Sequence, residues 1–326
     1  MIIVLTFTTS PKTREHTMLD FTKITTSPIA NRKNKFHLAD MILPGAYLSK
    51  PIESISAIAE RMVKAKKNDR SIVLQMGAAV IKEGCSSLII DLMQRGYIQH
   101  IAGNGAVSIH DFEIALIGGT SEHVPDGLKN GTFGMAEETG RMMNEAINQG
   151  ASEGRGFGYA IGRMIDRRDL PHKEYSLAWN CFKLGIPFTI HVSLGCDIIH
   201  QHPLCDGAAT GAATFTDFKI FTETISRIKQ GVVLNYGSAV AMPEVFLKAL
   251  TIARNLGCNV DRFTTVNFDF FNMYRPRTRI VEWPKTLDCE GFDIRGGHRQ
   301  TFPALHQAIG EIEKRTQYTE RTTCSV

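Results

Sequence analysis

Short apolar runs alternate with amphipathic stretches from residue 71 onward, and this alternation predicts the fold class. Strands are expected at residues 72–76, 97–102, 188–194, 232–236 and 263–268, and helices at 86–96, 109–117, 215–228 and 243–255. Repeated strand-helix-strand units imply right-handed crossovers and a parallel sheet that is buried on both faces. We therefore predict an α/β fold, a three-layer sandwich with a mostly parallel, doubly wound Rossmann-like sheet.

The first part of the chain follows a different pattern. Residues 1–40 are polar and show no sustained period, so we expect a loosely ordered arm or a partner-docking segment there. Apolar residues then recur with helical spacing over residues 54–67, and a second amphipathic helix is expected at 133–148. We predict two parts, a polar N-terminal arm of residues 1–40 and a single α/β domain of residues 41–326.

Composition narrows the classes of partner and compartment. The chain has 326 residues, 43% of them hydrophobic, and a net charge of only +4 with scattered basic residues. This argues against nucleic acid as a partner and favours a small-molecule substrate. No apolar run is long enough to span a membrane, and the apolar start lacks the basic residues of a secretion signal. Seven cysteines without a CxxC pair favour a cytoplasmic location.

Glycines and hydrogen-bonding side chains follow four of the predicted strands. These loops cover residues 103–111, 195–206, 235–238 and 267–275. Ligands of open parallel sheets bind beyond the carboxyl ends of the strands, where backbone N–H groups and helix N-termini converge. The first loop, with Gly103 and Gly105, lets the backbone approach a ligand closely, although Ser108 breaks the dinucleotide fingerprint. We expect the ligand site at this edge of the sheet.

The second loop is the richest in ionisable side chains. His191, Asp197, His200 and His202 lie within twelve residues. Two imidazoles and a carboxylate suit zinc or iron, but histidines at such loops also bind substrates, act as general bases or serve only as structural hydrogen-bond partners. All three alternatives stay open.

Two further tracts have a functional and a structural interpretation each. Asp206 and Gly207 open a small-residue helix that either lines a site or packs tightly. The arginines between residues 274 and 279 suit an anionic group or a subunit contact, and they are also typical of an exposed turn.

The order of motifs between residues 71 and 308 resembles the deoxyhypusine synthase family. The resemblance rests on residues 85–93 with Gly105-Ala106-Val107, on Ser193-Leu194-Gly195-Cys196-Asp197, on residues 231–233 and on Phe302-Pro303-Ala304-Leu305. It implies an NAD-dependent transferase that moves an aminobutyl group from spermidine to a protein lysine through an imine. It also implies a homotetramer.

The loops and the resemblance together give the candidate site residues. Lys285, as carrier of the imine, and His202 and His200, as proton carriers, are the catalytic candidates. Substrate binding is expected at Asp197, Asn235, Asn267, Asp269, Arg275 and Trp283. Cofactor binding is expected at Gly103, Asn104, Gly105, Ala106, Asp111, Asp206 and Gly207, and no metal is assigned.

Departures from the family pattern change the expected substrate. Asn235 stands where the family has its base histidine, and Arg279 and Gly297 stand where carboxylates are expected. A site that loses carboxylates and gains arginine is poorly matched to a polycation. The sequence therefore predicts an NAD-dependent enzyme that transfers an aminoalkyl or related amine group from a substrate other than spermidine. The alternatives are a metal-dependent hydrolase that uses His191, His200 and His202, or a non-catalytic NAD-binding protein.

Overall fold

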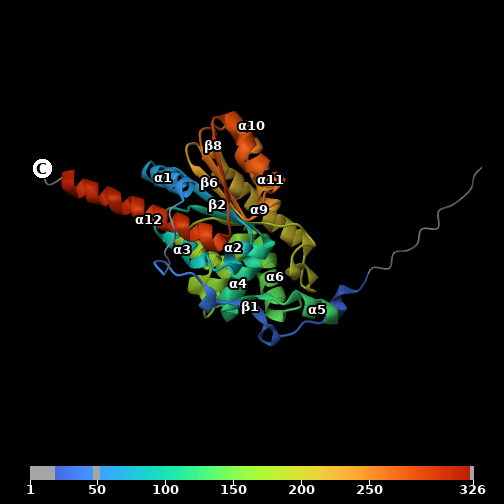
Figure 1. Cartoon of the computed structure of the whole chain (residues 1–326). Coiled ribbons are helices and arrows are strands. Elements are labelled where there is room, and N and C mark those ends of the chain that lie inside the picture. The colour runs from blue at the N-terminus through green and yellow to red at the C-terminus, as the bar shows by residue number, and fades with distance from the viewer. Residues whose placement is uncertain (1–18, 47–51, 324–326) are drawn as a thin grey trace, which may run out of the picture.

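A computed structural model of the chain describes residues 19–46 and 52–323, and it is built around one parallel sheet. The six strands lie in the order β5-β3-β2-β6-β7-β8, and all neighbouring pairs are parallel (Figure 1). Counted along the chain this order is 3-2-1-4-5-6, that of the doubly wound dinucleotide-binding fold. The bounds are β2 Ile72–Met76, β3 His100–Asn104, β5 Phe188–His191, β6 Val232–Tyr236, β7 Thr264–Asp269 and β8 Glu290–Arg295.

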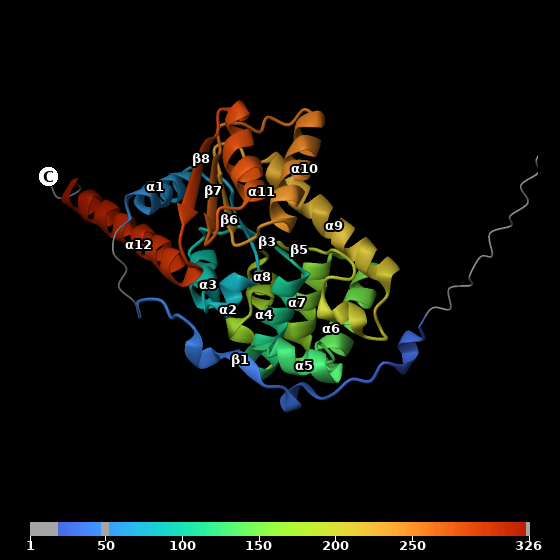
Figure 2. The same cartoon turned by 45° about the vertical axis from the view of Figure 1, so that its right-hand side comes forward.

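Helices cover both faces of the sheet, which confirms the predicted three-layer sandwich. One face packs on α1 (Glu53–Lys67) and α12 (His298–Thr323), which lie side by side, and the other packs on α9 (Gly207–Ser226) and α10 (Ala241–Asn255) (Figures 1 and 2). Helix α1 turns Ile55, Ile58 and Met62 inward because apolar residues three and four apart share one helix face.

Most of the remaining helices gather below the sheet in Figure 2. They support the ends of β3 and β5 and carry the loops of the carboxyl edge. They are α2 (Ala79–Lys82), α3 (Ser86–Gln94), α4 (Gly105–Ile117), α5 (Val124–Asn130), α6 (Glu137–Ser152), α7 (Phe157–Arg167) and α8 (Leu177–Leu184).

The described part of the N-terminal segment packs on the rest of the chain. Strand β1 (Asn34–His37) pairs antiparallel with β4 (Gly119–Glu122). The Arg32 guanidinium lies 2.7 Å from the buried Glu113 carboxylate, so this end of the segment is held by an ion pair as well as by the ladder. Residues 1–18 of the predicted arm lie outside the described residues.

Most predicted elements are present, with shifted ends. The strand expected at 97–102 runs instead over His100–Asn104, because Tyr97 still closes the preceding helix with an N–H bond to the Leu92 carbonyl. The helix expected at 133–148 begins at Glu137. Strand β8 and helix α12 were not predicted.

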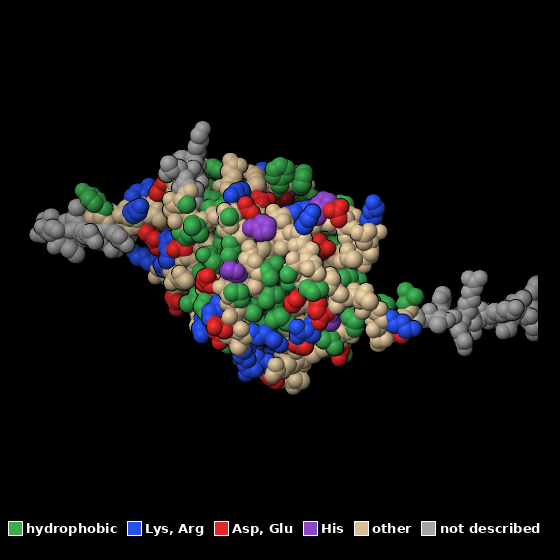
Figure 3. Space-filling view, turned by 90° about the horizontal axis from the view of Figure 1, so that it is seen from below, with side chains coloured by type: hydrophobic (Ala, Val, Ile, Leu, Met, Phe, Trp, Pro, Cys, Tyr) green, Lys and Arg blue, Asp and Glu red, His purple; other side chains and the backbone are tan. Residues whose placement is uncertain are grey.

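The surface carries no wide field of one charge on the face shown in Figure 3, where acidic, basic and apolar side chains are intermixed. Within the described ranges, the search for membrane spans found no helix of sufficient length and apolarity to cross a bilayer.

Candidate functional site

The centre of the carboxyl edge lies between β2 and β6. The strands that follow β2 in the chain lie on one side of this point, and those that follow β6 lie on the other. The Gly77 N–H donates to the Tyr236 carbonyl at 2.8 Å. A Cβ atom on Gly77 would stand 2.3 Å from the Gly237 oxygen, and Gly237 itself has a φ of +62°. Only glycines allow the two loops to run this close together. In doubly wound sheets the ligand crevice lies just outside the point where the strand order reverses, which here is this point between β2 and β6.

The loop between β3 and α4 flanks this crevice and contains four of the predicted cofactor residues. Gly103 packs against Val107, and Gly105 opens α4. Asn104 ends the strand, and its Oδ1 atom is buried with no hydrogen-bond partner among the described residues. Gly103, Asn104, Gly105 and Ala106 thus stand together at the carboxyl edge.

The loop after β5 brings Asp197 and His200 to the same edge. A Cβ on Gly105 would lie 1.9 Å from Asp197 Oδ2, so this carboxyl group sits against the first turn of α4. His200, in the short helix Ile198–Gln201, accepts the N–H groups of Gly195 and Asp197 through Nδ1, each at 3.1 Å. Burial raises the pKa of Asp197 to about 6 and lowers the pKa of His200. Asp197 can therefore change protonation near neutral pH, whereas burial favours the neutral ring of His200.

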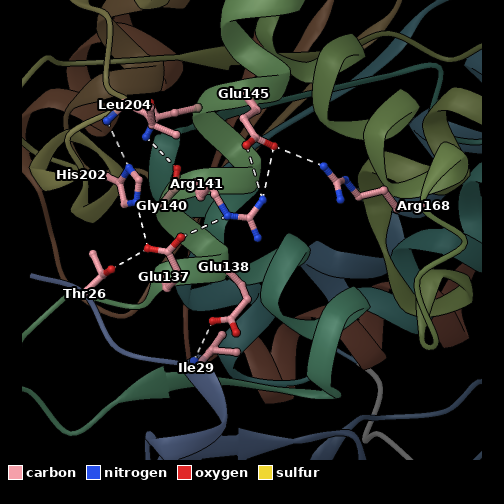
Figure 4. A network of polar contacts seen from close by, with 11 residues as sticks. Thr26, Ile29, Glu137, Glu138, Gly140, Arg141, Glu145, Arg168, His202 and Leu204 are labelled. Atoms are coloured by element: carbon pink, nitrogen blue, oxygen red, sulfur yellow. Dashed lines mark hydrogen bonds and ion pairs between the residues drawn. The ribbon is translucent and has the colours of Figure 1, made fainter.

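His202 is engaged elsewhere. Its Nε2 lies 3.3 Å from Glu137 Oε2, and its Nδ1 accepts the Leu204 N–H at 3.2 Å (Figure 4). The same carboxylate accepts the hydroxyl of Thr26 from the N-terminal segment, and the neighbouring Glu138 accepts the Ile29 N–H at 2.7 Å. His202 thus joins the loop after β5 to α6 and to the N-terminal segment.

The three histidines of the metal alternative do not converge. The Nε2 atom of His191 faces Thr189, whereas His200 bonds its own loop and His202 bonds Glu137. Within the described ranges, no group of three or more metal-binding side chains is close enough to hold an ion. The hydrolase built on these histidines is therefore not proposed below.

Amide side chains line the other half of the edge. Asn235 Nδ2 donates to the Ser238 carbonyl at 3.1 Å and to Asn267 Oδ1 at 2.8 Å, and Asn267 Nδ2 donates to Asp293 at 2.9 Å. Asn235 and Asn267 have no exposed surface, so their amides hold β6, β7 and β8 together. Asp269 Oδ1 accepts the Phe271 N–H at 3.1 Å, which shapes the loop after β7.

His298 belongs to this edge and was missed from the sequence. It follows Gly296 and Gly297 at the end of β8, and a Cβ on Gly237 would come 2.4 Å from its Nε2. Burial lowers its pKa. The same pattern that located the other loops, a strand followed by glycine and a polar side chain, is present at 290–298, but no strand was predicted there.

Three predicted cofactor residues have structural contacts instead. The buried Asp111 accepts the Ser176 hydroxyl at 2.6 Å and the N–H groups of Leu177 and Ala178 at 2.6 and 3.0 Å, so it caps α8. Burial raises its pKa to about 6. Asp206 caps α9 by accepting two N–H groups of its first turn, and Gly207 is exposed. None of the three contacts the Gly77 and Gly237 crevice in these bonds.

Lys285 lies at the opposite edge of the sheet. The segment after it reaches back to the start of β7, where Arg262 N–H donates to the Leu287 carbonyl at 3.1 Å. A cavity of about 290 Å³ at this amino-terminal edge is lined by Asp288 together with the first residues of β6 and β7. The structure therefore does not bring Lys285 to the strand ends within one chain.

Arg275 and Trp283 lie on the outer side of α10. Arg275 and Arg279 both pair with Glu244, at 3.3 and 2.6 Å. The Arg279 guanidinium also stacks 5.0 Å from the centre of the Trp283 ring. These contacts form a surface cluster at the first turn of α10, which contains Glu244.

Comparisons with known proteins agree with the fold. Residues 56–154 match the family described as arginine dihydrolase ArgZ-like, C-terminal, Rossmann fold. No curated protein matches the sequence. A protein described as a LOR/SDH protein from Methanococcus maripaludis S2 is 15% identical with a TM-score of 0.53, over 83% of this chain and 72% of that chain.

Two further solved structures match the chain. The ternary complex of AgrE with ornithine and NAD+ is 15% identical with a TM-score of 0.51, over 80% of this chain and 33% of that one. The chain thus spans about a third of the length of AgrE. A protein described as a deoxyhypusine synthase from Entamoeba histolytica is 13% identical with a TM-score of 0.48, over 82% of this chain and 91% of that one. The Rossmann-like fold is confirmed, and the assignment to deoxyhypusine synthase stays a prediction.

Proposed function

We propose that the chain is an NAD-dependent enzyme that acts on a small molecule containing an amine, with the cofactor bound across the ends of β2 and β6. The observation that carries this proposal is the contact between Gly77 and Gly237 at the centre of a 3-2-1-4-5-6 sheet. Ornithine and NAD+ in the AgrE complex supply the classes of substrate and cofactor.

The residues around the crevice fit the pyrophosphate of NAD. Helix α10 has 15 residues and begins four residues beyond Gly237, so its positive end stands close to the crevice. In its first turn the Met242 N–H donates to Ser238 Oγ at 3.1 Å and Pro243 has no N–H, so the attraction for an anion comes from the helix dipole. Val240, just before this helix, is 51% exposed.

Helices α10 and α4 each have a carboxyl group at the first turn, but Glu244 of α10 is paired with Arg275 and Arg279, whereas Asp197 lies directly against Gly105 of α4. We therefore assign the pyrophosphate to α10.

The chemistry proposed for the site is oxidation at a carbon next to nitrogen. Bound NAD supplies the hydride acceptor. Asp197 is the group that we assign to the amino group of the substrate, because a cation beside it favours its ionised form. A subsequent transfer of an aminoalkyl group through a substrate imine is the finer form of this proposal. It uses no covalent lysine from the same chain, since Lys285 lies at the other edge.

A charge placed at the start of α10 tests the cofactor site. Val240→Asp puts a carboxylate beside the proposed pyrophosphate, whereas Val240→Asn has nearly the same shape without the charge. An acidic residue at a helix N-terminus favours the helix, so folding is expected to be retained. We expect NAD affinity, measured by calorimetry, to fall about tenfold or more in Val240→Asp and to change little in Val240→Asn.

Turnover is measured separately, as NADH absorbance with ornithine, arginine and a set of diamines. NADH formation by the unmodified protein supports the enzyme, and NAD binding without NADH formation indicates the non-catalytic alternative. Absence of NAD binding to the unmodified protein contradicts the proposal as a whole.

A further inference from the structure

Four side chains form a hydrogen-bonded chain that joins α9 to the edge strand β5 and to its neighbour β3. Thr224 Oγ1 lies 2.7 Å from His100 Nδ1, and His100 Nε2 lies 2.9 Å from Thr189 Oγ1. Thr189 Oγ1 lies 3.1 Å from His191 Nε2. His100 and Thr189 are fully buried and His191 is 6% exposed, so these four groups depend on each other for hydrogen bonds.

An apolar side chain separates these four hydrogen-bonded groups from other polar groups. The Phe221 ring stands edge-to-face to both imidazoles, with centroid distances of 5.4 Å to His100 and 5.3 Å to His191. Burial lowers the pKa of each imidazole to about 3. Both rings are therefore neutral at neutral pH, and each has one N–H donor and one acceptor nitrogen.

The carbonyl of Ile220 decides which atom donates in each of these hydrogen bonds. It lies 3.3 Å from Thr224 Oγ1, and it can only accept. The single hydroxyl proton of Thr224 is used there, so Thr224 accepts from His100 Nδ1–H. It follows that His100 Nε2 accepts from the Thr189 hydroxyl.

The same reasoning fixes the tautomer of His191, the last of the four side chains. With its proton donated to His100, Thr189 Oγ1 accepts from His191 Nε2–H. A neutral ring has no second proton, so the Nδ1 atom of His191 has a free lone pair. No described residue is hydrogen-bonded to this Nδ1.

The free lone pair stands at the carboxyl edge of the sheet. His191 is the last residue of β5 and pairs in register with Asn104, the last residue of β3. Register partners project to the same face, and Asn104 Oδ1 is also an acceptor without a partner. Two adjacent acceptors suit a group with several N–H donors, such as an amine.

We propose that His191 Nδ1 accepts a proton from an amine bound at the strand ends, and that His100, Thr189 and Thr224 are positioning residues that fix its tautomer and relay the proton. This inference rests on the function proposed above, and it adds the residues that take up the proton.

The relay conserves every proton. The amine N–H bond breaks and His191 Nδ1–H forms, while His191 Nε2 gives its proton to Thr189 and Thr189 gives its own to His100 Nε2. His100 Nδ1 then protonates Thr224, which is partly exposed and releases its former hydroxyl proton to solvent. A concerted transfer suits this site because a charged imidazole buried beside Phe221 is costly.

Nitrogen NMR of the full-length protein tests this proposal, because it measures which nitrogen of His191 is protonated. We expect protonated Nε2 and unprotonated Nδ1 in the unmodified protein. Thr189→Val removes the central hydroxyl and should give a mixture of tautomers, and Thr189→Ser should restore the single one. Thr265→Val is the matched control, because Thr265 is a fully buried threonine on the same sheet face that takes no part in these hydrogen bonds.

A titration with butylamine tests the amine. We expect it to shift the His191 Nδ1 signal in the unmodified protein and in Thr265→Val, with an affinity about fivefold to tenfold lower in Thr189→Val. A protonated Nδ1 in the free protein overturns the proposal, and so does an Nδ1 signal that butylamine leaves unchanged. If the expected shifts occur but no amine yields NADH, the proposed oxidation fails while the proton acceptor stands.

Discussion

The two halves of the sheet bury polar side chains on the same face, but of different chemical kinds. Over β3 and β5 these side chains are imidazoles and hydroxyls, His100, Thr189 and His191, joined end to end. Over β6 and β7 they are the amides of Asn235 and Asn267, which continue to Asp293 on β8. His191 and the two amides lie close to the carboxyl ends of their strands, whereas His100 is the first residue of β3.

The difference separates a half that can move protons from a half that holds strands together. A neutral imidazole can exchange one tautomer for the other, whereas an amide keeps one set of donors and acceptors at all ordinary pH values. The amide half therefore serves as a scaffold beside the crevice. Its removal should affect stability, and removal of the imidazole chain should affect the response to pH.

The largest effect is expected from breaking the amide row at Asn235. Asn235→Leu removes the donor to Ser238 and to Asn267 and leaves two buried acceptors unpaired. We expect the free energy of unfolding to fall by about 3 kcal/mol, measured by urea denaturation. The same change at the exposed Asn255 should cost less than about 0.5 kcal/mol. Equal losses at the two positions would mean that the amide row does not hold the strands.

The imidazole half should make the folding stability depend on pH in the acid range. Burial lowers the pKa of His100 to about 3 in the folded protein, whereas an unfolded histidine titrates near 6.5. Between these values the unfolded state binds more protons, so the contribution of His100 to stability is present at neutral pH and falls as the pH drops. From pH 7 to pH 5 this loss is about 2 kcal/mol.

His100→Gln isolates this contribution. Asp197 and Asp217, whose pKa values burial raises to about 6 and about 7, act in the opposite direction, but they are present in both proteins and cancel. The stability difference between the unmodified protein and His100→Gln should shrink by about 2 kcal/mol between pH 7 and pH 5. A difference that stays constant would show that His100 is not held neutral.

Much of the fold could be predicted because local patterns of apolar residues and glycines indicate the strands and helices. Residues 72–76 are apolar except for Gln75, with apolar side chains on both faces as a central parallel strand requires, and glycine follows several of the elements. Strand β8 was missed because Glu290, Gly291 and Asp293 interrupt its apolar pattern: it is an edge strand, and its outer side need not be apolar.

The candidate site was predicted by position more than by role. The loops at 103–111 and 195–206 reach the expected edge because strand direction alone decides this. Partners are decided by tertiary packing, which is why Asp111 caps α8 and His202 bonds Glu137. Lys285 followed the motif order of a family, but one helical segment between β7 and β8 carries it to the other end of the sheet.

The smallest effect is expected at Gln75, which lies in the same row as Asn235 on the neighbouring strand. It is fully buried, and neither atom of its amide has a hydrogen-bond partner in the described structure. An unpaired buried amide costs free energy, so Gln75→Met, which keeps the length of the side chain, should leave stability unchanged or raise it by up to about 1 kcal/mol in urea denaturation. A loss of more than about 2 kcal/mol would instead indicate ordered water bound to this amide, and the scaffold would then extend from β6 across the crevice to β2.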